Sequence, residues 1–273
     1  MDREITNNTL FNEIIRIDFY KIKDIDSMAQ KIQELLTPEK YNFKTVDIRN
    51  VNINIEDPET LFTQELIKSN INTTKNYEYI SQDENHKFVI NEYFVIFEKN
   101  NFLTYSKIEK YLENLKKIID TIVCTEKELK ITRVGIRKMN QLFVGNISSI
   151  KKYFNISIPK EDYEILDEYS ITQKNVDNVK YSSNIVLNLK KGKGTIEKKQ
   201  IQMYRFVWDI DCYVRKVETD MVIKEVNNLN NHLFEKYANI ITENLYKILQ
   251  NNNLDYKSLQ VQDDIYGGIN KNG

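Results

Sequence analysis

The sequence predicts an α+β protein of two tandem β-α-β-β-β-α units, which form antiparallel sheet or sheets with long helices packed on one face. Two observations predict this class. Stretches of alternating apolar and polar residues recur along the chain, which is typical of half-buried strands. Residues 106–123 and 222–250 instead repeat apolar side chains every three or four positions, which is typical of helices that lie on a sheet.

The first unit is expected to span residues 1–125. Its elements are a strand at 11–22, a helix at 27–36, strands at 41–55, 76–81 and 87–99, and the helix at 106–123. The polar run "QDENH" separates the last two strands, and Ser106 with Glu109 forms a capping box at the start of the second helix. The stretch 58–70 fits either a short helix or a strand.

The second unit is expected to span residues 126–266 and to repeat that order. It has a strand at 129–144, a short helix at 147–154, strands at 162–173, 180–190 and 199–214, and the long helix at 222–250. Arg16 would then correspond to Arg133, and Ile108 to Val226. Each sheet has an apolar face that a helix must cover, so the two units should pack as one compact body. Residues 267–273 should form a frayed tail.

Composition and charge exclude several function classes. The chain has 39 Lys+Arg and 40 Asp+Glu, which does not favour a nucleic-acid-binding protein. It has no N-terminal signal pattern and no apolar run long enough for a membrane span, so we expect a cytoplasmic protein without membrane contact. No phosphate-binding loop, nucleophile-base pair or cofactor motif is present, so we expect no cofactor. The oligomeric state is left open.

The central stretch "ITRVGIRKMN" places two arginines on one face of its strand. Period-two alternation puts Arg133, Gly135 and Arg137 on that face. The same rule puts Trp208 on the core side of its strand, and Arg205, Asp209 and Asp211 on the other side.

The first strand repeats this mixed face with Arg16 and Asp18. Arg133 and Arg137 could therefore face Asp18, Asp209 and Asp211 across neighbouring strands, away from the helices. Two interpretations stay open. The face is either an ion-paired surface or a groove in which guanidinium groups bind phosphate or carboxylate.

A second basic feature is the stretch "LKKGKGTIEKKQ" at 189–200, which we expect to form the tip of a hairpin. The pair Asp209 and Asp211 is a weaker candidate for a divalent metal site. The candidate ligand- or partner-binding residues are Arg16, Arg133, Arg137, Arg205, Lys190, Lys191 and Lys193.

The stretch "RVGIRKMNQL" resembles the central signature of a sporadically distributed, functionally uncharacterised family of bacterial proteins of about this length. That signature reads Arg-Ile-Gly-Leu-Arg-Tyr-(Ile/Leu/Val)-Asn. Arg133, Gly135, Arg137 and Asn140 match it, and Lys138 stands in place of its aromatic residue. The segments 94–119 and 229–245 extend the resemblance over most of the chain. The patchy distribution of the family implies a phage-related, defence or mobile-element setting.

We therefore expect a non-enzymatic recognition protein that binds a protein partner or an anionic ligand through the arginine-bearing face. The alternative is a divalent-metal-dependent phosphodiester or phosphoryl-transfer enzyme that uses Asp209 and Asp211.

Overall fold

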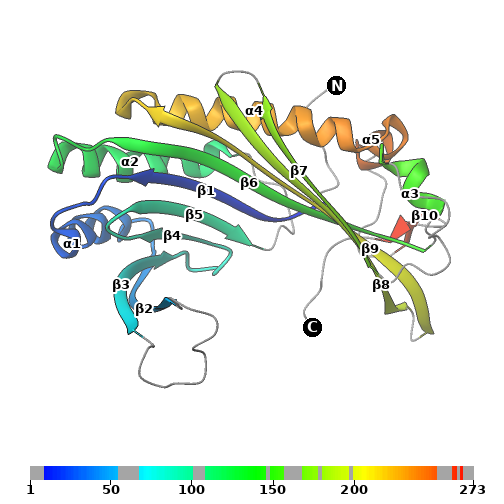
Figure 1. Ribbon diagram of the computed structural model, residues 1–273, viewed down its shortest axis with the longest axis horizontal. Coiled ribbons are helices and arrows are strands. Elements are labelled where there is room, and N and C mark those ends of the chain that lie inside the picture. The colour runs from blue at the N-terminus through cyan, green and yellow to red at the C-terminus, as the bar shows by residue number, and fades with distance from the viewer. Residues whose placement is uncertain are drawn as a thin grey trace.

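The computed structural model describes residues 9–54, 68–100, 108–145, 148–156, 168–177, 180–196, 199–250, 260–262 and 265–266. Within these ranges the strands form a single antiparallel sheet (Figure 1). From one edge to the other its main path runs over β2 (Asn42–Asn54), β3 (Lys68–Ile80), β4 (His86–Ile90), β5 (Phe94–Asn100), β1 (Leu10–Phe19), β6 (Ile131–Val144), β9 (Lys199–Val217), β8 (Tyr181–Ile196) and β7 (Glu168–Asp177). Two short strands, β10 (Gln260–Gln262) and β11 (Ile265–Tyr266), pair with each other, and β11 also pairs with β6.

The predicted fold class is wrong, because one continuous sheet dominates the structure in place of two equal β-α-β-β-β-α units under long helices. The first half contributes five strands, since the stretch 87–99, predicted as one strand, is the hairpin of β4 and β5. The Asn91 side chain accepts hydrogen bonds from the backbone N–H groups of Tyr93 at 2.8 Å and Phe94 at 3.0 Å, which stabilises the turn.

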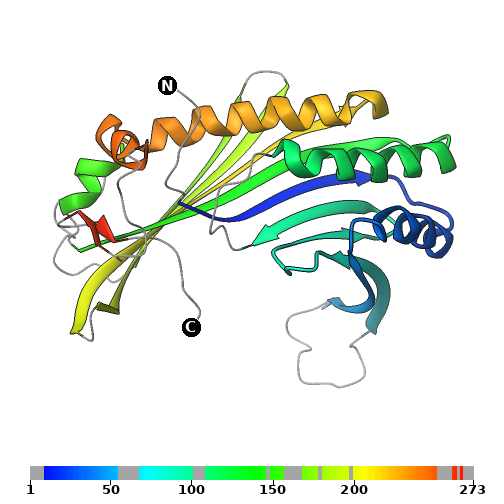
Figure 2. The same ribbon diagram turned by 180° about the vertical axis from the view of Figure 1, so that it is seen from behind.

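The sheet also extends past the helices. The β2–β3 pair at one edge and the far end of the β8–β9 pair both project beyond them (Figures 1 and 2). The ambiguous stretch 58–70 lies mostly outside the described residues, as does the tail 267–273.

Three helices lie on one side of the sheet, the far side in Figure 1 and the near side in Figure 2. They are α1 (Ile25–Leu36), α2 (Glu109–Thr125) and α4 (Val222–Ile240), the last of which follows the short 3₁₀ turn Thr219–Met221. Among the described residues no side-chain hydrogen bond caps the start of α2, and the predicted capping residue Ser106 lies outside them.

The single helix predicted at 222–250 is also wrong, because α4 ends at Ile240 and a separate helix, α5 (Glu243–Gln250), follows. Ile241 is extended and forms a bridge with Phe154, which comes directly after α3 (Ser148–Tyr153). The Thr242 hydroxyl then accepts a hydrogen bond from the Leu245 N–H at 3.3 Å and so caps α5. In the sequence, the three-to-four-residue apolar period continues across residues 241 and 242, so the break between the two helices cannot be seen there.

The core lies between the sheet and these helices. One cross-strand row of buried side chains runs through Tyr79, Phe88, Phe97, Ile15, Ile136 and Cys212. Trp208 is fully buried on the same face, where its ring lies 5.9 Å from that of Tyr237 on α4 and 5.3 Å from that of Phe154. The predicted core position of Trp208 is confirmed. No helix in the described part of the chain combines the length and apolar character that crossing a membrane requires.

Candidate functional site: the arginine face of the sheet

The opposite face of the sheet is turned toward the viewer in Figure 1. The register of the central strands β1, β6 and β9 places Arg16, Arg133 and Arg137 on it. In the register of the β1–β6 and β6–β9 pairs, Arg133 lies between Asp18 and Arg215, Gly135 between Arg16 and Tyr213, and Arg137 between Ile14 and Asp211. Because directly opposed residues of antiparallel strands share a face, the register places these side chains on one surface. We call it the arginine face: Arg16, Asp18, Arg133, Gly135, Arg137, Asp209, Asp211, Tyr213 and Arg215.

Arg133 extends along β6 over Gly135 and joins two carboxylates. Its Nη2 atom donates to Asp211 at 3.1 Å, and its Nη1 atom lies 3.7 Å from Asp18. Its Cζ atom lies 4.7 Å from the centre of the Tyr213 ring, within the range of a cation–π interaction.

Gly135 makes this path possible. A Cβ atom at position 135 would lie 3.2 Å from Arg133 Nη2 and 3.4 Å from Tyr213 Cβ. The register runs through this position without a bulge in either neighbouring pair. The glycine therefore gives room for a close approach of the guanidinium group.

Arg137 and Arg16 form the two other ion pairs of the face. Arg137 binds Asp209 with two nitrogens, Nε at 2.9 Å and Nη2 at 2.5 Å, and its side chain is 45% exposed. Arg16 Nε donates to Asp18 at 2.7 Å, and its Cζ atom lies 4.6 Å from the centre of the Phe94 ring. Each aspartate of the face thus orients a guanidinium group that still reaches solvent. Of the two interpretations left open by the sequence, this arrangement agrees with the ion-paired surface.

The two carboxylates proposed as metal ligands are engaged by arginines, Asp209 by Arg137 and Asp211 by Arg133. Burial raises the pKa of the Asp211 carboxyl, and the neighbouring arginines offset this effect only in part. Across the described ranges, no group of three or more His, Cys, Asp and Glu side chains is arranged to hold a metal ion.

The remaining predicted residues do not join this cluster. Arg205 pairs with Phe143 and Lys190 in the sheet register, further along β9, and its Nε donates to the Gln141 side chain at 3.0 Å. Lys190, Lys191 and Lys193 are strand residues of β8, since β8 continues to Ile196, so they are not at a hairpin tip. Alternation places Lys191 on the face opposite to Lys190. The seven predicted residues therefore do not converge in one groove.

Sequence reasoning missed the residues that surround the arginines. Tyr213 lies at the end of the strand predicted at 199–214 and Arg215 directly follows that strand, so continuing the alternation of Asp209 and Asp211 would have found both. Alternation in the first predicted strand also puts Tyr20 on the face of Arg16 and Asp18, whereas Tyr93 lies in the β4–β5 turn, which the sequence did not reveal. Tyr20 and Tyr93 are 63% and 47% exposed, and the hydrogen bond from Phe19 N to Tyr93 O at 2.9 Å places them at the same end of β1 and β5.

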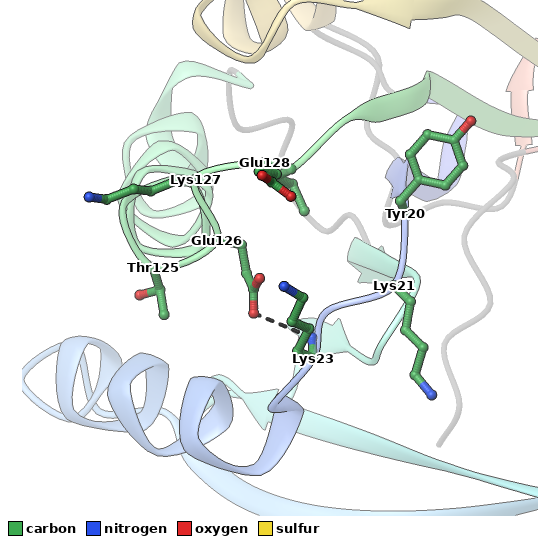
Figure 3. Close-up of a pocket in the computed structure, with 8 residues that line it drawn as sticks. Tyr20, Lys21, Lys23, Thr125, Glu126, Lys127 and Glu128 are labelled. Carbon is green, nitrogen blue, oxygen red and sulfur yellow. Dashed lines mark hydrogen bonds between the residues drawn. The ribbon is translucent and has the colours of Figure 1, made fainter.

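A cavity of about 480 Å³ opens beside Tyr20, between the connection from β1 to α1 and the connection from α2 to β6 (Figure 3). Figure 3 shows lysine and glutamate side chains around it. The Lys23 backbone N–H donates to Glu126 at 3.3 Å, and Lys21 pairs with Glu92 at 3.1 Å. The lysines around the cavity thus lie beside glutamates, and its lining residues include no His, Cys or Ser that could act as a catalytic base or nucleophile.

No model of a known protein family matches this chain, and no curated protein sequence matches it.

Proposed function

We propose that this chain is a non-enzymatic recognition protein that binds a protein partner through the arginine face. The observation that carries the proposal is the row of guanidinium groups on the side of the sheet away from α1, α2 and α4, held in place by aspartates and aromatic rings. Arginine and tyrosine are enriched at the centres of protein interfaces, where residues that are already ordered lose little entropy on binding.

The charges of the face fit a partner with anionic groups. Arg16 and Arg137 are 41% and 45% exposed, so each retains donors that point to solvent. Exposed Tyr20 and Tyr93 at the end of the face add apolar contact area with a polar tip. The alternative function, a divalent-metal-dependent enzyme that uses Asp209 and Asp211, receives no support, because both carboxylates are paired with arginines. A role in phage conflict, defence or mobile elements rests on the family resemblance alone.

The proposal is tested with a partner that a tagged form of the chain recovers from its native host and that is then purified. Arg16→Ala and Arg137→Ala should each weaken its binding about tenfold or more, as expected for residues at the centre of an interface. Unfolding should stay cooperative with a loss of about 1 kcal/mol or less, since both pairs are largely exposed.

Lys224→Ala is the control, because Lys224 is an exposed cation on α4, on the other side of the sheet. Equal binding by the control and both face variants would overturn the proposal. Large losses of stability without any change in binding would show that the arginines are structural.

A further inference from the structure

Within the part of the chain that the structure describes, Arg215 differs from the other arginines of the face in having no carboxylate partner. It lies directly opposite Arg133 in the β6–β9 register and is exposed. Its Cζ atom lies 5.5 Å from the centre of the Tyr213 ring, within the range of a cation–π interaction. Like charges directly opposite each other on neighbouring strands are destabilising, so the pair of cations needs an explanation.

Both guanidinium groups lie near one tyrosine ring. Arg133 Cζ is 4.7 Å and Arg215 Cζ is 5.5 Å from the centre of Tyr213. The ring faces both cations at cation–π distance, so the two guanidinium groups are held near each other on one side of it. Arg133 uses Nη1 and Nη2 toward aspartates, and a guanidinium group has five N–H donors in total.

We infer that Arg133, Arg215 and Tyr213 form a subsite for one carboxylate of an acidic segment in the partner protein, an inference that rests on the proposed function. A carboxylate here would accept hydrogen bonds from both guanidinium groups and relieve their repulsion. Tyr20 and Tyr93, at the same end of the central strands, would contact the flanking residues of that segment.

The charge balance of the face favours a protein carboxylate over a nucleic-acid backbone. Four arginines stand beside three aspartates, so the cluster has only one positive charge in excess: Arg16, Arg133, Arg137 and Arg215 against Asp18, Asp209 and Asp211. A nucleic acid presents a row of phosphates and needs a correspondingly dense row of cations. The three carboxylates would repel such a row but leave room for one anionic group.

The test uses the full chain and a short fluorescein-labelled peptide rich in glutamate, with binding measured by fluorescence anisotropy. Arg215→Gln should weaken peptide binding about tenfold, the loss expected for a hydrogen bond to a charged group. Arg215→Lys should fall between Arg215→Gln and the natural chain, because it keeps the charge but loses the planar fork. Tyr213→Phe should bind like the natural chain, since the ring is retained.

Lys224→Gln is the matched control, because it removes the same charge from α4 on the other side of the sheet. A peptide with glutamine in place of glutamate should bind much more weakly than the acidic peptide. The inference is overturned if Arg215→Gln binds the acidic peptide as the natural chain does, or if the control loses as much. It is also overturned if a single-stranded DNA oligonucleotide binds more tightly than the peptide in a manner that depends on Arg215.

Failure of this inference can be separated from failure of the proposed function. If the acidic peptide does not bind, while Arg137→Ala still weakens binding of the purified partner, the face is an interface without this subsite. If no substitution on the face affects the purified partner, the proposed function fails whatever the peptide does.

Discussion

At the residue scale, Gly135 explains why the central strand carries two arginines around a glycine. Arg133 does not pair with Arg215, which lies directly opposite, but reaches Asp211, which lies opposite Arg137. Its guanidinium group must cross position 135 to do so, and any Cβ atom there would meet it at 3.2 Å. The glycine therefore gives the Arg133 guanidinium group room to approach, and no left-handed backbone conformation at position 135 calls for it.

Substituting Gly135 with valine tests this role of the glycine. The larger side chain should push Arg133 away from Asp211 and crowd Tyr213, with a loss of about 1–3 kcal/mol in the free energy of unfolding. Gly192→Val is the matched control, because Gly192 is an exposed glycine of β8 where an added Cβ meets nothing within 4 Å. The control should be neutral or slightly stabilising, since valine favours strands. Urea denaturation measures both, and equal stability of the two variants would contradict this account of Gly135.

At the scale of elements, sequence reasoning located most strands and helices but not their breaks. Alternation identified β1, β6 and β9, and the three-to-four-residue period identified α2 and α4, because each has one buried and one exposed face. The turn at Asn91 and the break at Ile241 were missed. At both positions a local contact ends the regular element while the apolar pattern of the sequence continues. The sequence pattern alone therefore could not show either break.

The same limit applies to the candidate site. Alternation on three separate strands correctly grouped Arg133 and Arg137 with aspartates on the side of the sheet away from the helices. It could not give the register between β6 and β9, which decides that Arg133 reaches Asp211 and that Arg215 is left opposite a like charge. Nor could it show that Arg205 and the β8 lysines lie further along the sheet. Register depends on pairs of strands, whereas periodicity is a property of one strand.

Strand β9 packs against α4 through Trp208. Trp208→Ala should lower the free energy of unfolding by about 3–5 kcal/mol, because it removes a fully buried ring that packs between the sheet and the helix. Val207→Ala is the control, since Val207 is a half-buried neighbour on the other face of β9. It should cost clearly less. Urea denaturation followed by far-ultraviolet circular dichroism measures both, and a cost for Trp208→Ala no larger than that of the control would contradict its place in the core.

At the scale of the whole molecule, the two halves of the chain meet at the β1–β6 pair in the middle of the sheet. A buried ion pair lies at this junction, where Lys138 Nζ is 3.1 Å from Glu13 Oε1 and the two side chains are 10% and 2% exposed. Tyr111 of α2 donates to the same glutamate at 2.8 Å, and Lys138 donates to Asn230 of α4 at 2.8 Å. This network connects both central strands and both long helices, so it links the segments 1–125 and 126–266.

We expect the two halves to unfold together for this reason. Two probes report on them separately: Trp208 is buried in the second half, and Cys124, an exposed residue of α2, can carry a fluorophore while Cys212 is buried. In urea, intrinsic Trp208 fluorescence and the signal of a label on Cys124 should show one coincident transition. Two separated transitions would mean that the segments are independent domains joined by a weak contact.

The junction itself is tested by Lys138→Ala, which leaves the Glu13 carboxylate buried without its cation. This variant should lose about 3–5 kcal/mol, and both probes should shift to lower urea together, because the network spans the two halves. The double variant Glu13→Leu with Lys138→Met removes both charges and keeps the volume, so it should recover much of that loss. If Lys138→Ala moves only the Trp208 transition, or if the double variant is less stable than Lys138→Ala, then the ion pair does not hold the halves together and the apolar side chains of β1 and β6 carry the junction alone.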